Sequence, residues 1–151
     1  GRNEITGGTV SPSYISPIQG LQRLQRIMDE YVGGIATNYM TNENMLNRGL
    51  ELLKWLEEDL ENVGAEDYHQ LMRAWELKHR TITSQCVTEH TKFRKETRWP
   101  GYYYRGDHLK LDDENWHCLT VSRRDPITKE FIMEKVPVYH IVDEKKEKKA
   151  S

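Results

Sequence analysis

Apolar side chains recur every three or four positions through three stretches of this chain, the spacing that places them on one face of an α-helix. The first stretch begins at Ser16, which precedes a proline and lies three residues before Gln19, the arrangement of a capping box. The stretch ends at Gly33 and Gly34. Its expected apolar face consists of Leu21, Leu24, Met28 and Tyr31.

Two longer stretches predict a second and a third helix. The second stretch has a natural stop at Gly64, and the third follows Glu66 and Asp67, whose charges suit the start of a helix. The third pattern continues for about 28 residues, or roughly 40 Å of helix. The expected apolar face of the second helix is Met45, Leu46, Leu50, Leu53, Leu56, Leu60 and Val63. That of the third helix is Tyr68, Leu71, Trp75, His79, Ile82, Cys86, His90 and Phe93.

These patterns also predict what each helix covers. We expect Trp75 to lie in the bundle core, so that Trp75→Ala would cost about 3 to 5 kcal/mol. Leu52 and Trp55 fall outside the stripe of the second helix. A second covered face is therefore expected on that helix, in contact with something outside this chain.

After the third helix the pattern changes to a loop and then to strands. The segment from Lys95 to Trp116, which we call the aromatic loop, mixes aromatic and charged residues with helix-breaking glycine and proline. Residues 117–122 and 130–138 then flank a turn that contains Asp125 and Pro126, as in two antiparallel strands.

The predicted fold class is mainly α. It consists of a three-helix up-down-up bundle, similar to a spectrin repeat, followed by the aromatic loop and a small C-terminal β-hairpin. We divide the chain into an extended lead-in over residues 1–15, a helical domain over 16–142 and a disordered charged tail over 143–151. The chain opens without a methionine, and we interpret it as part of a longer polypeptide.

Composition and charge limit the kinds of partner and the cellular compartment that we expect for this chain. Charged residues make up 30% of the chain but the net charge is only −2, so no basic stripe is available for nucleic acid or for a membrane surface. No apolar run is long enough to span a membrane, and no signal peptide is visible. Cys86 and Cys118 form no paired motif, which predicts a reducing, cytoplasmic setting.

Signals for catalysis are few, because the chain lacks a dinucleotide fingerprint, a phosphate loop, a nucleophile elbow and a paired-histidine zinc motif. His79 and His90 project from one side of the third helix but are too far apart to share an ion. We favour a structural role for both over metal binding or proton relay. The same holds for a looser cluster that consists of Asp107, His108, Asp112, Asp113, His117 and Cys118.

The aromatic loop is the best candidate for a functional surface. Tyrosine and tryptophan rings supply contact area, and arginines and aspartates can pair once a seam is partly desolvated. Because no positive field surrounds these rings, protein packing is favoured over nucleic-acid stacking. The expected domain-interface residues are Arg98, Trp99, Tyr102, Tyr103, Tyr104, Arg105, Asp107, Asp112, Asp113 and Trp116.

The loop also carries a family resemblance. Arg105, Asp107, Asp112, Asp113 and Trp116 keep the spacing R-x-D-x(4)-D-D-x-x-W, which resembles the C-terminal helical domain of fumarate reductase and succinate dehydrogenase flavoproteins. A Trp-Pro-Gly-Tyr-Tyr-Tyr run replaces the Gly-Ala-His usual in the dicarboxylate enzymes. That variant, together with G-I-A-T-N-Y-M-T-N over residues 34–42, is similar to the flavin-carrying alpha subunits of dissimilatory adenylylsulfate reductases.

The resemblance implies a heterodimer of an FAD subunit with an iron–sulfur beta subunit that carries 4Fe–4S clusters. Such enzymes interconvert adenylylsulfate with sulfite and AMP. Their flavin-binding and substrate-binding residues belong to preceding domains, so the resemblance implies no catalytic, cofactor-binding or metal-binding residue here. It implies a supporting domain, inactive alone, that packs on the flavin domain and adds surface for assembly. The alternatives are the same domain of a dicarboxylate reductase and a freestanding helical protein-binding module.

Overall fold

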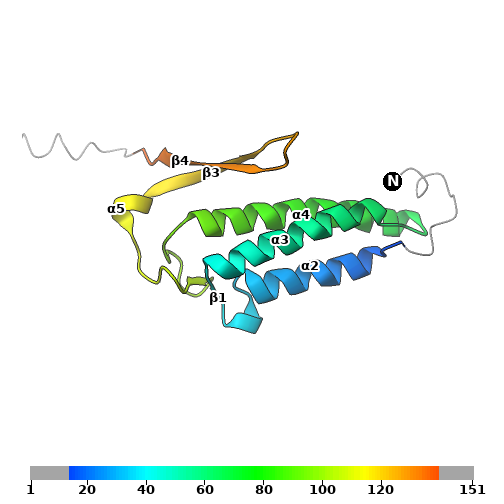
Figure 1. Ribbon diagram of the computed structural model, residues 1–151, viewed down its shortest axis with the longest axis horizontal. Helices are drawn as coiled ribbons and strands as arrows, with labels where there is room; N and C mark the ends of the chain where they lie inside the picture. Colours follow the sequence, from blue (N-terminus) through cyan, green and yellow to red (C-terminus); the bar gives the residue numbers. More distant parts are fainter. Residues whose placement is uncertain (1–13, 140–151) are drawn as a thin grey trace, which may run out of the picture.

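The computed structural model describes residues 14–139, and its main body is an antiparallel bundle of three helices (Figure 1). These helices are α2 (Pro17–Tyr31), α3 (Glu43–Asp59) and α4 (Tyr68–Phe93). Short 3-10 turns, η1 (Ile35–Thr37) and η2 (Leu60–Asn62), lie in the two connections. The predicted up-down-up bundle is confirmed. The predicted charged tail and most of the lead-in lie outside the described residues.

Each helix begins at a polar side chain that caps it. Ser16 and Gln19 form the expected capping box at α2. Asn42 Oδ1 accepts from the Met45 N–H at 2.9 Å to cap α3, and Asp67 Oδ1 accepts from the Gln70 N–H at 2.7 Å to cap α4. These caps satisfy backbone donors that have no partner within the helix, so the three starts follow directly from the sequence.

The bundle core is built from leucines of α2, α3 and α4. At Gly20 the helices approach so closely that an added Cβ would lie 2.5 Å from the Leu77 Cδ2. Leu52 packs against this core from the side, whereas Trp55 remains 43% exposed beneath the Arg48 guanidinium. The buried core residues are Leu24, Ile27, Leu53, Leu56, Leu60, Val63, Ala74 and Leu77.

The core-facing side of α4 differs from the predicted one. Trp75 is 53% exposed and Tyr68 is 85% exposed, so the expected placement of Trp75 in the core is wrong. The residues that face α2 and α3 are instead Ala74, Leu77, Thr81, Gln85 and Thr88. The hydroxyls of Thr81 and Thr88 donate to carbonyls four positions earlier in α4, which lets these polar residues be buried without loss of a hydrogen bond.

The predicted stripe on α4 forms a second face, which we call its outer face. Strands β3 (Cys118–Arg124) and β4 (Phe131–Pro137) form the expected antiparallel hairpin, which lies along this face (Figure 1). His90 contacts two hydroxyls of β3, Thr120 Oγ1 at 3.1 Å and Ser122 Oγ at 2.9 Å. The hairpin is therefore fixed to the C-terminal half of α4 by polar contacts.

A short parallel pair closes the end of the bundle near that hairpin. Strand β1 (Met40–Thr41) pairs with β2 (Tyr104–Arg105). Helix α5 (Asp113–Trp116) then leads into β3. The aromatic loop thus lies between the end of α4 and the start of the hairpin, and it contacts the connection between α2 and α3.

Candidate domain interface

Arg105 is the anchor of the aromatic loop. Its side chain is fully buried, and its guanidinium donates to the carbonyls of Thr91, Lys92 and Arg94 at 2.6 to 3.1 Å. These are carbonyls at the C-terminal end of α4, where backbone acceptors lack intrahelical partners and the helix dipole is negative. Arg105 therefore caps α4 from a distant part of the chain.

Asp107 balances the buried charge of Arg105. Both carboxylate oxygens accept from the guanidinium at 2.9 Å, and one also accepts from the Glu43 N–H at the start of α3 at 3.0 Å. The hydrogen bond from Arg105 is the main reason why the pKa of Asp107 falls to about 2. Through this pair, the loop connects the end of α4 to the beginning of α3.

Glu96 is a second buried hub. It has no exposed surface, and it accepts hydrogen bonds from Arg94 at 2.7 Å, from Arg98 at 2.6 Å and from the Asp112 N–H at 2.9 Å. Burial alone would raise the pKa of Glu96, but these three donors hold it below its usual value. Arg98 also binds Asp113 at 2.8 Å, so α5 is held against the loop.

Arg94 and Trp116 join this network to the hairpin. Arg94 donates to the carbonyls of Trp116 and Cys118 at 2.8 and 2.9 Å. The Trp116 ring is buried edge-on against Phe93, with ring centroids 5.4 Å apart, and the Lys135 ammonium lies 3.5 Å from its centre. Residues 94–116, which we call the 94–116 segment, are thus held as one unit by buried charges and one aromatic contact.

The ten predicted interface residues separate into six that are bonded within the domain and four aromatic residues that are exposed or half-buried. Arg105 and Trp116 are buried within the domain, and Arg98, Asp107, Asp112 and Asp113 make hydrogen bonds inside it. Trp99 and Tyr102 are exposed by 64% and 80%, and Tyr103 and Tyr104 are half-buried. The group bonded within the domain fixes the shape of the segment, and the exposed rings are the part available for contact.

Exposed apolar side chains of the α2–α3 connection extend this surface. Strand pairing between β1 and β2 places residues 39–41 beside residues 104–106. A groove of about 640 Å³ between α2 and α4 reaches the same place, lined by Met28 and Tyr102 among others. We call the resulting patch the aromatic end, and its exposed members are Ile35, Tyr39, Met40, Trp99 and Tyr102.

Three of the acids considered for metal binding make hydrogen bonds within the domain. Asp112 caps α5, and Asp113 binds Arg98. Glu43, Asp107 and His108 do place one potential ligand atom each within 4.8 Å of one another. However, both oxygens of Asp107 are engaged by the Arg105 guanidinium, whose positive charge opposes a cation there. This geometry favours a structural role for these groups.

Sequence reasoning missed two members of the network, Glu96 and Arg94, as site residues. The available signal was the position of one carboxylate with an arginine two residues away on each side. Such spacing marks a residue whose charge can be matched locally when it is buried.

Comparison with known proteins identifies the family of this chain. Residues 21–149 match the family model for the fumarate reductase flavoprotein C-terminal domain. The chain belongs to this family. It is 43% identical to adenylylsulfate reductase subunit alpha of Megalodesulfovibrio gigas over 142 residues, which cover 94% of this chain and 21% of that protein. The chain thus spans about a fifth of the length of this curated relative.

Solved structures of the flavoprotein family share the fold at two levels of similarity. The adenylylsulfate reductase of Archaeoglobus fulgidus is 57% identical, with a TM-score of 0.84 over 87% of this chain and 21% of that one. The quinol fumarate reductase of E. coli is 20% identical, with a TM-score of 0.72 over 85% of this chain and 22% of that one. The second match shows the fold alone.

Proposed function

We propose that this chain is the C-terminal supporting domain of the flavoprotein subunit of a dissimilatory adenylylsulfate reductase. The observation that carries the proposal is its 57% identity to the Archaeoglobus fulgidus enzyme over 87% of the chain. The parent enzyme would convert adenylylsulfate and two electrons to sulfite and AMP, reversibly. The low identity to the fumarate reductase argues against the dicarboxylate alternative.

In this proposal the redox groups lie outside the chain. FAD is bound by the preceding domain of the same subunit, and 4Fe–4S clusters are carried by a beta subunit. The sequence contains no dinucleotide fingerprint, which agrees with a supporting role. Among residues 14–139, no helix is long and apolar enough to cross a membrane. The unpaired cysteines support a cytoplasmic enzyme.

The aromatic end is the surface proposed to contact the flavin domain. Its exposed rings are presented by a segment whose backbone is held by Arg105 and Glu96, so little conformational entropy is lost when they bind. Trp99→Ala should therefore weaken docking while leaving the fold intact, because this ring is 64% exposed. Limited proteolysis between the two domains would report the weaker docking.

The test of the proposed function compares this chain with the full-length subunit. The full-length protein should show flavin absorbance and, with its iron–sulfur partner, should reduce adenylylsulfate. The isolated chain should be colourless and inactive. Flavin or activity in the isolated chain would contradict the proposal, and so would a full-length protein that turns over fumarate instead.

A further inference from the structure

The turn between α2 and β1 holds two consecutive residues in a left-handed backbone conformation. Asn38 has a φ of 52° and Tyr39 has a φ of 61°. This conformation crowds the Cβ atom against the following carbonyl oxygen, so residues other than glycine adopt it at a cost. Asparagine tolerates it better than most residues, whereas a bulky tyrosine is an outlier there. The turn is therefore strained, and other contacts must hold it in this form.

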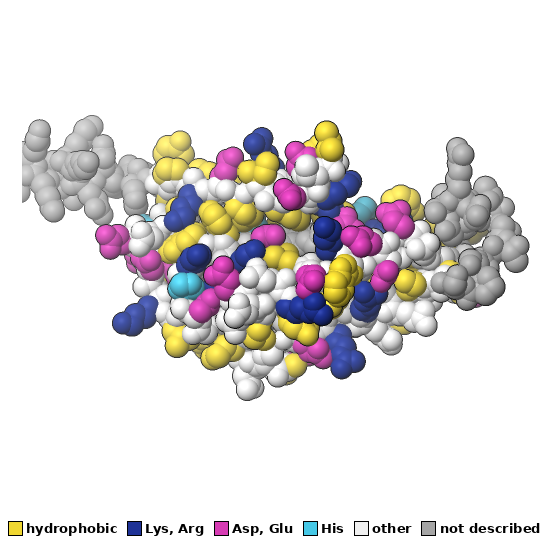
Figure 2. Space-filling view, in the orientation of Figure 1, with side chains coloured by type: hydrophobic (Ala, Val, Ile, Leu, Met, Phe, Trp, Pro, Cys, Tyr) yellow, Lys and Arg dark blue, Asp and Glu magenta, His cyan; other side chains and the backbone are white. Residues whose placement is uncertain are grey.

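Hydrogen bonds within the turn fold it back on itself. The Gly34 carbonyl accepts from the N–H and the hydroxyl of Thr37 at 3.2 Å each, and from the Tyr39 N–H at 2.8 Å. Figure 2 shows hydrophobic and uncharged side chains at the lower edge of the molecule, where this connection lies. Residues 33–41 contain no charged residue, so no side chain of this stretch can hold the turn through an ion pair.

A contact with a distant part of the chain completes the closed form of the turn. The Tyr104 N–H, at the start of strand β2, donates to the Tyr39 carbonyl at 2.7 Å. Gly33, with a φ of 87°, lies against the same carbonyl, because an added Cβ there would be 3.2 Å from the Tyr39 oxygen. The Tyr39 carbonyl is thus confined between the end of α2 and the aromatic loop, and its strained conformation depends on the pairing with β2.

The neighbouring contact of the same strand pair is anchored more firmly. Thr41 is fully buried, whereas Tyr39 is 42% exposed. The Thr41 hydroxyl donates to the Tyr31 carbonyl at the end of α2 at 2.8 Å, and the Thr41 carbonyl accepts from the Gly106 N–H at 2.7 Å. Loss of the contact between Tyr39 and Tyr104 therefore leaves a buried, anchored pair beside it.

The strained turn also forms part of the wall of the groove between α2 and α4. The turn contributes Ile35 and Tyr39 to the lining of this groove of about 640 Å³, and α2 contributes Leu24 and Met28. Leu24 belongs to the bundle core, and Met28 packs against that core. Movement of the turn would therefore open the groove toward one side of the core.

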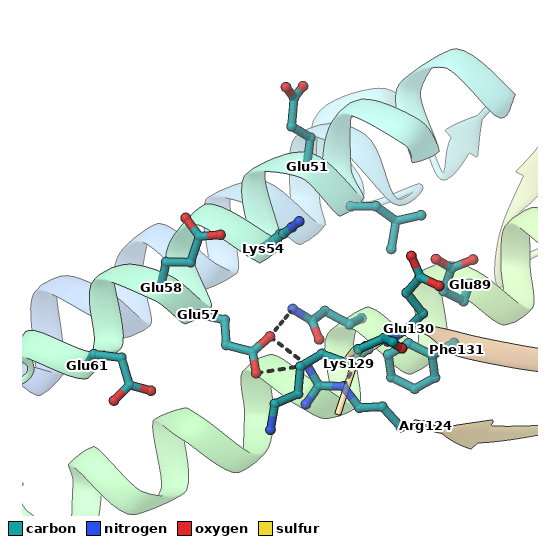
Figure 3. A pocket seen from close by; sticks show the side chains of 13 residues that line it. Glu51, Lys54, Glu57, Glu58, Glu61, Glu89, Arg124, Lys129, Glu130 and Phe131 are labelled. Atoms are coloured by element: carbon teal, nitrogen blue, oxygen red, sulfur yellow. Dashed lines mark hydrogen bonds and ion pairs between the residues drawn. The ribbon is translucent and has the colours of Figure 1, made fainter. Parts of the chain in front are cut away.

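A left-handed residue in the hairpin turn provides a contrast. Lys129 has a φ of 64° and lines a groove of about 710 Å³ between α3 and the hairpin turn (Figure 3). Its N–H donates to the Asp125 carbonyl at 3.0 Å, and its carbonyl accepts from the Arg124 Nε at 3.0 Å. Both partners belong to the same hairpin, where a single left-handed residue is common. Lys129 is thus held locally, whereas Tyr39 is held by a distant strand through Tyr104.

We propose that residues 33–39 form a latch that opens locally, by release of the contact between Tyr39 and Tyr104, while the bundle and the buried Thr41 stay in place. Opening lets Asn38 and Tyr39 leave the left-handed region, so it releases the strain that closure imposes. Exposed segments with few buried apolar contacts open at a lower free energy than the core does. The closed latch covers the groove between α2 and α4 at this end, and the open latch admits solvent to it.

Amide hydrogen exchange of the 151-residue chain, followed by NMR, tests the latch. The Tyr104 N–H should exchange about tenfold faster than the Gly106 N–H or more, after correction for intrinsic rates, because opening breaks the first contact and spares the second. Tyr39→Gly should slow the exchange of the Tyr104 N–H about threefold or more relative to Tyr39→Ala. Both variants lack the ring, but only glycine removes the strain of the closed form.

Lys129→Gly is the matched control, because it relieves a left-handed residue outside the latch. It should leave the ratio of the Tyr104 and Gly106 exchange rates as in the wild type. Equal rates for these two amides, whether both slow or both fast, would overturn the inference, since the two contacts would then open together. Faster exchange of the Tyr104 N–H in Tyr39→Gly than in Tyr39→Ala would also overturn it, and so would a changed ratio in Lys129→Gly.

Discussion

The three-helix bundle buries leucines, whereas the 94–116 segment buries an arginine and a glutamate. In the bundle, Leu53 and Leu56 are fully buried and are surrounded by other apolar side chains. In the segment, Arg105 and Glu96 are equally buried, and their charged ends are held by hydrogen bonds and ion pairs. Apolar packing tolerates small changes of shape, whereas a buried charge tolerates the loss of its partners poorly.

The largest effect is expected from Arg105→Ala. This change removes the cation that pairs with Asp107 and leaves the carbonyls of Thr91, Lys92 and Arg94 without this donor, which should cost about 3 to 5 kcal/mol. Urea unfolding measures the loss. Arg105→Lys is the control, because it keeps the charge but cannot donate to all of these acceptors at once. A lysine variant as stable as the wild type would show that charge alone, rather than the guanidinium geometry, stabilises the segment.

A smaller loss, of about 3 kcal/mol, is expected from Leu56→Ala in the bundle, since the cavity can be partly filled by neighbouring side chains. The same urea titration applies. Leu52→Ala, at a half-buried position beside the core, should cost less. Equal losses for the two leucine variants would mean that Leu52 belongs to the bundle core as fully as Leu56 does, which would contradict the structure.

Acid should destabilise the 94–116 segment by about 2 kcal/mol through Asp107. Its pKa falls from 3.8 to about 2 on folding, so its contribution is complete above about pH 5 and is lost as pH falls toward 2. Glu96 acts in the same direction. Unfolding measured at pH 7, 4 and 2.5 should show this fall in the Leu56→Ala variant too. Asp107→Asn should show a flatter profile over that range, and a profile parallel to the wild type would place the acid sensitivity elsewhere.

The smallest effect is expected from Trp75→Ala. Because the ring is 53% exposed, the change should alter the free energy of unfolding by no more than about 0.5 kcal/mol. Thermal unfolding of the isolated chain provides the measurement. A loss of several kcal/mol would mean that Trp75 does lie in the core, as the sequence pattern predicts, and would contradict the structure.

Most of the bundle could be predicted because the sequence signals for each helix lie within or next to that helix. The caps at Ser16 and Asp67 give the starts of α2 and α4 directly, and Gly33 follows the end of α2, whereas α3 ends at Asp59, five residues before Gly64. The core face of α4 could not be predicted, because Thr81 and Gln85 are polar and the more apolar stripe lies on the outer face, which the hairpin covers in part. Periodicity identifies an apolar face but does not say which neighbour covers it.

The residues of the candidate interface could be predicted from the composition of the aromatic loop, but their arrangement in space could not. Trp99 and Tyr102 are exposed as an interface would require, and Arg105 is a structural anchor instead. Its role depends on carbonyls more than ten positions earlier, which only the folded chain brings within reach. Glu96 has two arginine partners close by in the sequence, but its contact with the Asp112 N–H, 16 positions away, forms only when the loop closes.

The parallel pairing of β1 with β2 has a consequence for the order of folding. Just beyond the paired strands, the Glu43 N–H donates to Asp107, a residue 64 positions away. Contacts between distant positions form late, because much of the chain must already be ordered before the two parts can meet. The helices can therefore associate early, while that end of the bundle stays open until residues up to Asp107 are present. A growing chain would thus form its helices first and its aromatic end only once Asp107 has been added.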